Sequence, residues 1–283
     1  FEYHGRNAHK KYGVNVVNRT DNHPVRHGEQ SIRFEVRSGD CGGKPGDSDC
    51  EVPSERSELH NAGPKDKAGK EYWYAWSVYF KDYEEIFFSP HHGQWKQFTK
   101  EYYDVYDKKV RKGESADVLM FTKYDDGLRA IVSQHTANQT TYLLIPNEEM
   151  ENQWHDLVLN VKWSAGSDGI IRVWRNGKFI VEHKGENIIT NDPLSFRFGI
   201  YRPMVDRSPQ SLPTQVVYYD EVMRGKTCEA VSQFSSCKDL SNQPLTSVVS
   251  NASAKAKESP ATELTTSGDI SVRISKVERD GTP

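Results

Sequence analysis

The chain has 283 residues, a formal net charge of −3 and 11% aromatic residues. Its length suits one large all-β domain or two smaller domains, and it is long enough to bury a sizeable core. A protein that binds nucleic acid through its charge usually carries a basic excess, which this composition lacks. No apolar run reaches the about 18 residues that a membrane-spanning helix requires. We therefore expect neither nucleic acid nor a membrane as a partner.

The cysteines form two local pairs, Cys41 with Cys50 and Cys228 with Cys237, and each pair encloses a short segment rich in Gly, Asp or Ser. Four cysteines allow three pairings, and the turn-like segments favour the local one. Neither spacing matches a zinc site. We expect two disulfides, with free buried thiols as the alternative. Disulfides imply an oxidising compartment, and a chain that starts at Phe1 without a signal-like segment fits the mature form of a secreted or periplasmic protein.

The first part of the chain has a polar, histidine-rich stretch followed by clear strand patterns. We expect residues 1–30 to wrap the outside of the domain. Residues 31–36 are a predicted strand because apolar and polar side chains alternate, and residues 72–80 because aromatic and β-branched residues fill them. We assign the aromatic residues of 72–80 to the core rather than to a ligand platform. Residues 101–116 are charged and tyrosine-rich, which predicts a loop or a short helix.

The second part of the chain contains two hairpin signals. The predicted strands are 117–123, 128–135, 154–163, the two halves of 169–183, 195–202 and 215–223. The first two are joined by Tyr124-Asp125-Asp126-Gly127, and the halves of 169–183 by Asn176-Gly177, the preferred two-residue turn between twisted strands. So many short strands with almost no helical periodicity predict an all-β antiparallel sandwich or jelly roll.

The end of the chain differs in composition from the rest. Residues 242–283 contain no aromatic residue and no cysteine, and they are rich in Ser, Thr, Ala and Lys. Such a segment is typical of a linker or tail. We therefore predict one β domain over residues 1–241 and a linker or tail over 242–283, in which residues 269–277 could add one strand.

Polar side chains line one face of three predicted strands, which are 56–60, the strand that follows a turn within 91–100, and 195–202. Side chains on a strand point to opposite faces in turn, so Phe196, Phe198 and Ile200 share a core face of 195–202, whereas Gly199 lies on the other face. The polar faces carry Arg56, Glu58 and His60; Gln94 and Lys96; and Arg197 and Tyr201, with Arg202 just beyond.

These residue types suit β-elimination in a polymer of uronic acids. That reaction neutralises a carboxylate, removes the adjacent C5 proton and protonates the leaving oxygen at C4. Arg, Lys or Gln can stabilise the carboxylate as it gains charge, and His or Tyr can move the protons. A tyrosine, with an ordinary pKa near 10, needs cationic neighbours to act as a base, and Arg56, Arg202 or Lys96 could supply them. The alternatives are a surface ion pair between Arg56 and Glu58 and a histidine of purely structural role.

Six segments in this order resemble the polysaccharide lyases of the heparin-lyase-I-like group, and within it the glucuronan lyases above all. They are RSEL at 56–59, YWYAWSVYF at 72–80, GQWK at 93–96, WRNGK at 174–178, FRFGIYR at 196–202 and YYDEV at 218–222. The resemblance covers residues 31–225. A more distant similarity to jelly-roll alginate lyases lies in the same three strands, whose patterns there are R-S-E-L, Q-x-H and Y-F-K-x-G-x-Y.

The resemblance implies a β-jelly roll whose concave face holds the polymer. It also implies that Gln94 neutralises the carboxylate, that Tyr201 acts as the acid or as both acid and base, and that Arg56 supports the carboxylate or Tyr201. The alginate-lyase pattern has His where this chain has Lys96, so the base is open, and we prefer His60. The other candidate bases are His91, His92 and His135. The candidate substrate-binding residues are Glu58, Lys96, Lys123, Arg129, His135, Arg197 and Arg202, of which Lys96, Lys123 and Arg129 could instead be merely solvated.

Related jelly rolls often carry a structural calcium ion on the convex side. Glu35 and Asp220 lie on predicted strands and could supply oxygen ligands. The resemblance implies no cofactor for catalysis.

Together these observations predict a secreted, monomeric, endo-acting lyase that cleaves an acidic polysaccharide by β-elimination, with glucuronan as the preferred substrate and alginate, heparin-like or ulvan polymers as alternatives. A glycoside hydrolase would need two carboxylates about 5–9.5 Å apart, but only Glu58 lies on the proposed face. A non-catalytic carbohydrate-binding module would explain the aromatic residues but not the cluster of Arg, Gln, His and Tyr.

Overall fold

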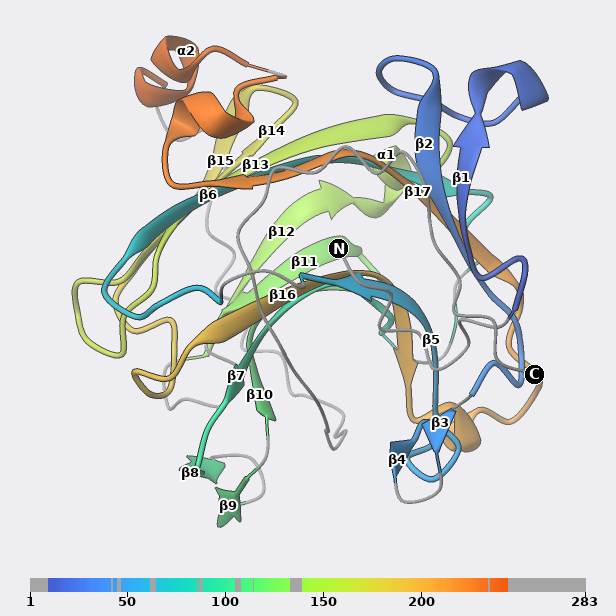
Figure 1. Cartoon of the computed structure of the whole chain (residues 1–283), viewed down its shortest axis with the longest axis horizontal. Helices are drawn as coiled ribbons and strands as arrows, with labels where there is room; N and C mark the ends of the chain where they lie inside the picture. Colours follow the sequence, from blue (N-terminus) through green and yellow to red (C-terminus); the bar gives the residue numbers. More distant parts are fainter. Residues whose placement is uncertain are drawn as a thin grey trace.

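The computed structural model describes residues 10–243 except 42, 45–46, 62–64, 85, 87–88, 105–107, 114, 133–138 and 234. In this part of the chain two antiparallel sheets pack face to face and arch in the same direction (Figure 1). The outer sheet has the order β1-β2-β17-β6-β13-β14-β15, and the inner sheet the order β12-β11-β10-β7-β16-β5. The face of the inner sheet that is turned away from the outer sheet is concave and points downward in Figure 1. The predicted all-β jelly roll is therefore confirmed.

The strands have the following bounds. The outer sheet contains β1 (Val14–Asn18), β2 (Gln30–Val36), β17 (Gln215–Gly225), β6 (Glu71–Lys81), β13 (Trp154–Lys162), β14 (Ile170–Arg175) and β15 (Lys178–Lys184). The inner sheet contains β12 (Thr140–Pro146), β11 (Gly127–Val132), β10 (Ser115–Tyr124), β7 (His91–Phe98), β16 (Leu194–Pro203) and β5 (Ser54–His60). Two small hairpins, β3 (Gly43–Lys44) with β4 (Asp47–Ser48) and β8 (Glu101–Asp104) with β9 (Lys109–Lys112), lie at opposite rims of the concave face (Figure 1).

The helices are short. They are α1 (Asn147–Met150), α2 (Cys237–Ser241) and the 3-10 helices η1 (Arg19–Asp21), η2 (Val205–Arg207) and η3 (Cys228–Val231). None of the described helices has both the length and the apolar character needed to span a bilayer.

The core lies between the two sheets and follows from the alternation of side chains. Phe196, Phe198 and Ile200 of β16 point into it, and each is at most 2% exposed. Trp95 of β7 stacks on Phe196 with ring centroids 4.6 Å apart, and Trp76 of β6 packs on the same ring from the outer sheet. Each large apolar side chain buried in this way contributes about 1.5–3 kcal/mol. The assignment of the aromatic residues in β6 to the core holds for Trp76 and for the alternate positions that share its face.

Most predicted strands are present, and the second hairpin turn has the expected geometry. Asn176 and Gly177 have φ angles of 49° and 74°, as the turn between β14 and β15 requires. Residues 101–116, predicted as a loop or short helix, instead contain the β8–β9 hairpin. The sequence reasoning also missed β1 and β12, which form an edge of the outer and inner sheet, respectively.

Both predicted disulfides are formed, Cys41–Cys50 and Cys228–Cys237. The second closes η3 against α2 on the convex side of the outer sheet (Figure 1). There the indole N–H of Trp174 donates to the carbonyl of Leu240 at 3.1 Å. The predicted tail strand at 269–277 lies outside the described residues, so the division into a domain and a tail stays a prediction.

A bulge in β16 distinguishes its two edges. Toward β5 the pairing is regular, and Gly199 faces Glu58 while Tyr201 faces Arg56. Toward β7 the register shifts between Phe198 and Tyr201, so β16 has one residue more than its partner there. Gly199 occupies this bulge with a φ of +134°, a conformation that is open essentially to glycine alone.

We predict that Gly199→Ala lowers the free energy of unfolding by at least about 2 kcal/mol. A Cβ at this position would lie 2.3 Å from the carbonyl oxygen of Ser57 and 2.8 Å from the Cα of Glu58. Urea unfolding followed by tryptophan fluorescence measures the loss. Gly28→Ala is the matched control, because Gly28 also has a positive φ but a Cβ there would meet no atom within 4 Å; its cost should be about 1 kcal/mol. Equal losses for the two variants would contradict the steric argument.

Candidate active site

The register of the inner sheet arranges six polar side chains in two rows on the concave face. The first row consists of His60, Arg197 and Gln94, because Arg197 of β16 pairs with His60 of β5 and with Gln94 of β7. The second row consists of Arg56, Tyr201 and His91, which are paired in the same way. The rows are four residues apart along β16, which is about 13 Å of extended strand. Glu58 and Gly199 lie between them.

The first row contains unpaired hydrogen-bonding groups. Gln94 donates from Nε2 to Oε1 of Glu58 at 2.6 Å. Its own Oε1, and Nε and Nη1 of Arg197, have no hydrogen-bond partner in the described part of the chain. Burial lowers the pKa of Arg197, and the carboxylate of Glu58 opposes this effect. A buried guanidinium with two unused donors is costly unless a ligand pairs with it, and a carboxylate is its best partner.

The second row is held in place by the ion pairs of Arg56. Arg56 donates to Asp49 from Nε at 2.8 Å and from Nη2 at 2.7 Å, and to Glu58 from Nη1 at 3.2 Å. Its guanidinium carbon lies 4.4 Å from the centre of the Tyr201 ring, which is the geometry of a cation–π contact. His91 covers the same tyrosine, with ring centroids 5.5 Å apart and an interplanar angle of 29°. Tyr201 is thus held between a cation and an imidazole.

Burial displaces the pKa of the phenol and the pKa values of the two imidazoles in opposite directions. Burial raises the pKa of Tyr201 above its usual value, although the charge of Arg56 acts against this. Burial and then the Arg197 guanidinium lower the pKa of His60 to about 4, and burial lowers that of His91 to about 4. At neutral pH the phenol therefore keeps its proton and both imidazoles are neutral, so the face holds a proton donor and two candidate acceptors.

Lys96 lies two cross-strand pairs beyond the first row, opposite Ser195. Its Nζ is 3.4 Å from Oδ2 of Asp117 on β10. Burial lowers the pKa of Lys96, and Asp117 acts against this.

Several predicted substrate-binding residues lie elsewhere. Arg202 is fully buried on the opposite side of β16 from Tyr201, paired with Glu55, because consecutive side chains of a strand point to opposite faces. Lys123 donates to the carbonyl of Tyr124 at 2.7 Å. Its neighbour Thr122 bonds to His91, so Lys123 takes the other face of β10.

Arg129 and His135 complete that set. Arg129 is held at the β10–β11 turn by Asp126, to which its Nε donates at 2.8 Å, and it lies two strands away from β7. The predicted role of His135 lies outside the described residues.

The predicted calcium ligands do not form a common site. Glu35 is paired with Arg33 and Arg37. Asp220 accepts hydrogen bonds from the backbone N–H groups of Arg26 and His27. Glu35 pairs across the sheet next to Val216, four residues before Asp220. No group of three or more His, Cys, Asp or Glu side chains suitable for a metal occurs among the described residues, and the residues proposed for calcium do not fit it.

Sequence reasoning missed two residues of the site and did not anticipate the contact of a third with Tyr201. Asp49, which binds Arg56, belongs to the first disulfide loop, and Asp117, which faces Lys96, belongs to a strand assigned by its apolar residues. His91 ranked below His60 as a candidate, yet it is the histidine that contacts Tyr201. In the sequence, His91 is distinguished only by its place directly before His92 and Gly93 at the start of the predicted turn and strand within 91–100. The bulge in β16, which brings His91 opposite Tyr201, could not be predicted from this pattern.

A buried histidine supports this part of the face from the core side. Nδ1 of His92 lies 3.2 Å from the carbonyl oxygen of Gly199, and its Nε2 lies 2.7 Å from the hydroxyl of Tyr83. The hydroxyl of Tyr219 also donates to the Gly199 carbonyl, at 3.3 Å. These bonds satisfy the carbonyl that the bulge removes from the ladder, and they fix His92 as the Nδ1–H tautomer.

We predict that His92 makes the protein less stable as the pH falls. Burial lowers its pKa to about 3, below the value near 6.5 expected in the unfolded chain. The unfolded state therefore binds more protons between these values, and stability present above pH 6.5 is lost as the pH falls toward 3. Between pH 7 and pH 5 His92 should contribute about 1–2 kcal/mol to this loss. His60 and His91, whose pKa values are also lowered, to about 4, add to the total, so His92→Gln should reduce the loss by the share of His92 alone.

Urea unfolding at the two pH values measures this difference. His27→Gln, which changes a histidine whose side chain is 58% exposed, should leave the loss as it is in the unmodified protein. An unchanged loss in His92→Gln would contradict the assignment.

Comparisons with known proteins show the family and the fold of the chain. The family model described as "Polysaccharide lyase" matches residues 3–223. Among solved structures, an endo-β-1,4-glucuronan lyase from Trichoderma reesei is similar with a TM-score of 0.59 and 18% identity, over 78% of this chain and 90% of that one. An alginate lyase from Pseudomonas aeruginosa matches with a TM-score of 0.47 and 17% identity, over 70% and 83%. A search of the curated proteins found no match. At these identities the similarity to the glucuronan lyase establishes the fold.

Proposed function

The chain belongs to the polysaccharide lyase family, and we propose that it is an extracellular, endo-acting enzyme that cleaves a glucuronan by β-elimination. The observation that carries this proposal is the Arg197 side chain, whose Nε and Nη1 have no hydrogen-bond partner among the described residues. It lies beside Gln94, on the same face as Tyr201 and His60. In this proposal the concave sheet holds an internal segment of a long polymer. The two disulfides are typical of an oxidising compartment.

We propose that Arg197 and Gln94 bind the carboxylate of the sugar that is cleaved. As the C5 proton leaves, the carboxylate gains negative charge, and preorganised donors that meet this charge lower the barrier. Glu58 accepts one hydrogen of the Gln94 amide, which fixes the amide plane and leaves the second N–H for the substrate. Lys96 extends the cationic surface toward a neighbouring sugar.

His60 is the proposed base and Tyr201 the proposed acid. The neutral imidazole takes the C5 proton, the electron pair of that C–H bond forms the C4=C5 double bond, and the bond between C4 and its oxygen breaks. Tyr201 gives its proton to the departing oxygen. In glucuronate the C5 proton and the C4 oxygen lie on the same side of the ring, so both groups can act from the sheet. One product then carries a 4,5-unsaturated uronate end.

The residues on the face argue against a hydrolase. The carboxylates of this region are Glu58 and Asp49, which bind Arg56, and Asp117, which pairs with Lys96. A hydrolase needs one protonated and one free carboxyl group across the scissile bond. A binding module would use exposed aromatic platforms, but Trp95 and Phe196 of the inner sheet face the core.

We predict that glucuronan incubated with the protein gains the ultraviolet absorbance of unsaturated uronates. In Tyr201→Phe the rate of this rise should be at least about 100-fold lower, while the affinity for the polymer stays within about twofold. The phenylalanine keeps the ring contacts of Arg56 and His91 and removes the proton donor. Alginate, heparin, hyaluronan and ulvan complete the panel. New reducing ends without this absorbance would identify a hydrolase, binding without new ends a binding module, and a larger rise with another polymer a different substrate.

We predict that kcat/KM falls as the pH drops through about 4, where His60 takes up a proton in the free enzyme, and that it stays level up to the pKa of Tyr201. The kcat of His60→Asn should be at least about 100-fold lower than that of the unmodified protein. His91→Asn replaces the other histidine of this face whose pKa is lowered to about 4. It should lose less kcat than His60→Asn, because it removes a ring contact of Tyr201 and leaves the proposed base in place. The reverse order of losses would assign the base to His91.

A further inference from the structure

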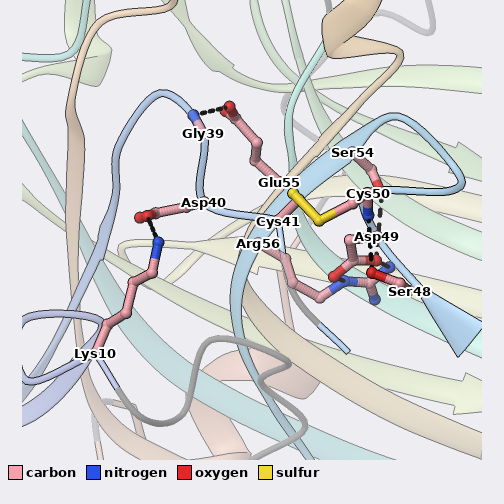
Figure 2. Close-up of a disulfide and its surroundings, with 10 residues drawn as sticks. All are labelled: Lys10, Gly39, Asp40, Cys41, Ser48, Asp49, Cys50, Ser54, Glu55 and Arg56. Carbon is pink, nitrogen blue, oxygen red and sulfur yellow. Dashed lines mark hydrogen bonds and ion pairs between the residues drawn. A yellow bond between two sulfur atoms is a disulfide. The ribbon is translucent and has the colours of Figure 1, made fainter. Parts of the chain in front are cut away.

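The first disulfide encloses a short loop beside the proposed acid. Figure 2 shows the Cys41–Cys50 bond next to the start of β5, with Asp49 and Arg56 directly below it. The loop sequence CGGKPGDSDC contains three glycines and few apolar residues, and its described residues include the β3–β4 pairing.

Residues on both sides of this disulfide bind the same arginine. Before Cys41, the carbonyl of Asp40 accepts from the backbone N–H of Arg56 at 3.4 Å. Before Cys50, the carboxylate of Asp49 accepts from two nitrogens of the Arg56 side chain at 2.7 and 2.8 Å. The disulfide therefore joins the two ends of a clamp on Arg56.

The carboxylate of Asp49 is itself positioned. Ser54, the first residue of β5, donates from its hydroxyl to Oδ1 of Asp49 at 3.2 Å and from its backbone N–H to the carbonyl of Asp49 at 3.0 Å. Asp49 is 1% exposed and Arg56 2%. A two-bond contact between a guanidinium and a carboxylate fixes the plane of the guanidinium as well as its position.

The plane of Arg56 matters because the ring of Tyr201 lies over it, 4.4 Å from the guanidinium carbon. Tyr201 has no covalent connection to the loop and belongs to β16. The ring can tilt about its own side-chain bonds, and the cation below it and His91 above it limit that freedom. A displacement of about 1 Å in a reacting group can cost about 100-fold in rate.

We propose that Asp49 is a positioning residue for the elimination and that the Cys41–Cys50 disulfide acts on turnover through it, by holding Arg56 under Tyr201. This inference rests on the proposed function, in which Tyr201 delivers the proton. Because Asp49 and Arg56 lie beneath the tyrosine and pair with each other, the clamp should govern the rate of proton transfer and have little effect on polymer binding.

The second disulfide of the chain is a matched control. Cys228 and Cys237 have the same sequence separation of 9 as Cys41 and Cys50, but they lie on the convex side of the outer sheet. Replacing either pair by serine removes one crosslink of equal span. A general loss of stability should affect both variants, whereas an effect on Tyr201 should be specific to the first.

The experiment measures kcat and KM on the best polymer of the panel for four variants: Asp49→Asn, Cys41→Ser with Cys50→Ser, Cys228→Ser with Cys237→Ser, and Asp49→Asn combined with the first pair. We expect the first two to lose about 10- to 100-fold of kcat with KM within twofold, and the control pair to keep its kcat. The combined variant should lose no more than the first pair alone, because both changes remove one interaction. Asp49→Glu, which keeps the carboxylate, should recover part of the kcat lost in Asp49→Asn.

Wild-type kcat in Asp49→Asn or in the first serine pair would overturn the proposal, as would losses that multiply in the combined variant or a KM that rises in parallel with the loss. If the first serine pair does not fold, as circular dichroism would reveal, Asp49→Asn and Asp49→Glu decide the question alone. A fully active Tyr201→Phe would instead overturn the proposed function, and the inference with it. An inactive Tyr201→Phe beside a fully active Asp49→Asn would overturn the inference alone.

Discussion

One strand serves two environments that place opposite demands on it. β16 lies in the interior of the inner sheet, with β5 and β7 on its two sides, and every residue of it is buried. One face must fill the core with rings such as Phe196 and Phe198, while the other carries Arg197 and Tyr201. Because side chains alternate between the two faces of a strand, every residue of β16 is committed either to the core or to the concave face. The positions of the polar groups are therefore only as variable as the packing of the rings behind them.

The bulge at Gly199 is how the fold relaxes this constraint at one point. A regular strand would hold Tyr201 in the same register toward both neighbours. The extra residue on the β7 side lets His91 meet the tyrosine, while the regular side keeps Arg56 beneath it. The carbonyl released by the bulge would be a costly buried acceptor, and His92 and Tyr219 satisfy it from the core. Local distortion in the site is thus compensated by polar groups within the apolar layer.

The alternation of side chains in the sequence predicted which residues share a face of a strand, but it could not predict which distant segments come into contact. Alternation placed Arg56, Glu58 and His60 on one face, and it also implied that Arg202 lies opposite Tyr201, a consequence that the substrate-binding assignment overlooked. β12 was missed because its apolar residues Leu143, Leu144 and Ile145 are consecutive and show no alternation. Which strands become neighbours, and that a loop carboxylate reaches Arg56, depends on packing between distant segments, which no local pattern encodes.

The convex side of the molecule offers a practical attachment point. The last described residue, Gln243, accepts a hydrogen bond from the backbone N–H of Phe179 on β15 at 3.0 Å, next to the cap formed by η3 and α2 on the outer sheet (Figure 1). This anchor lies on the far side of both sheets from Tyr201. A solid support, a fluorescent label or a fused domain joined after Gln243 would consequently leave the polymer-facing surface unobstructed.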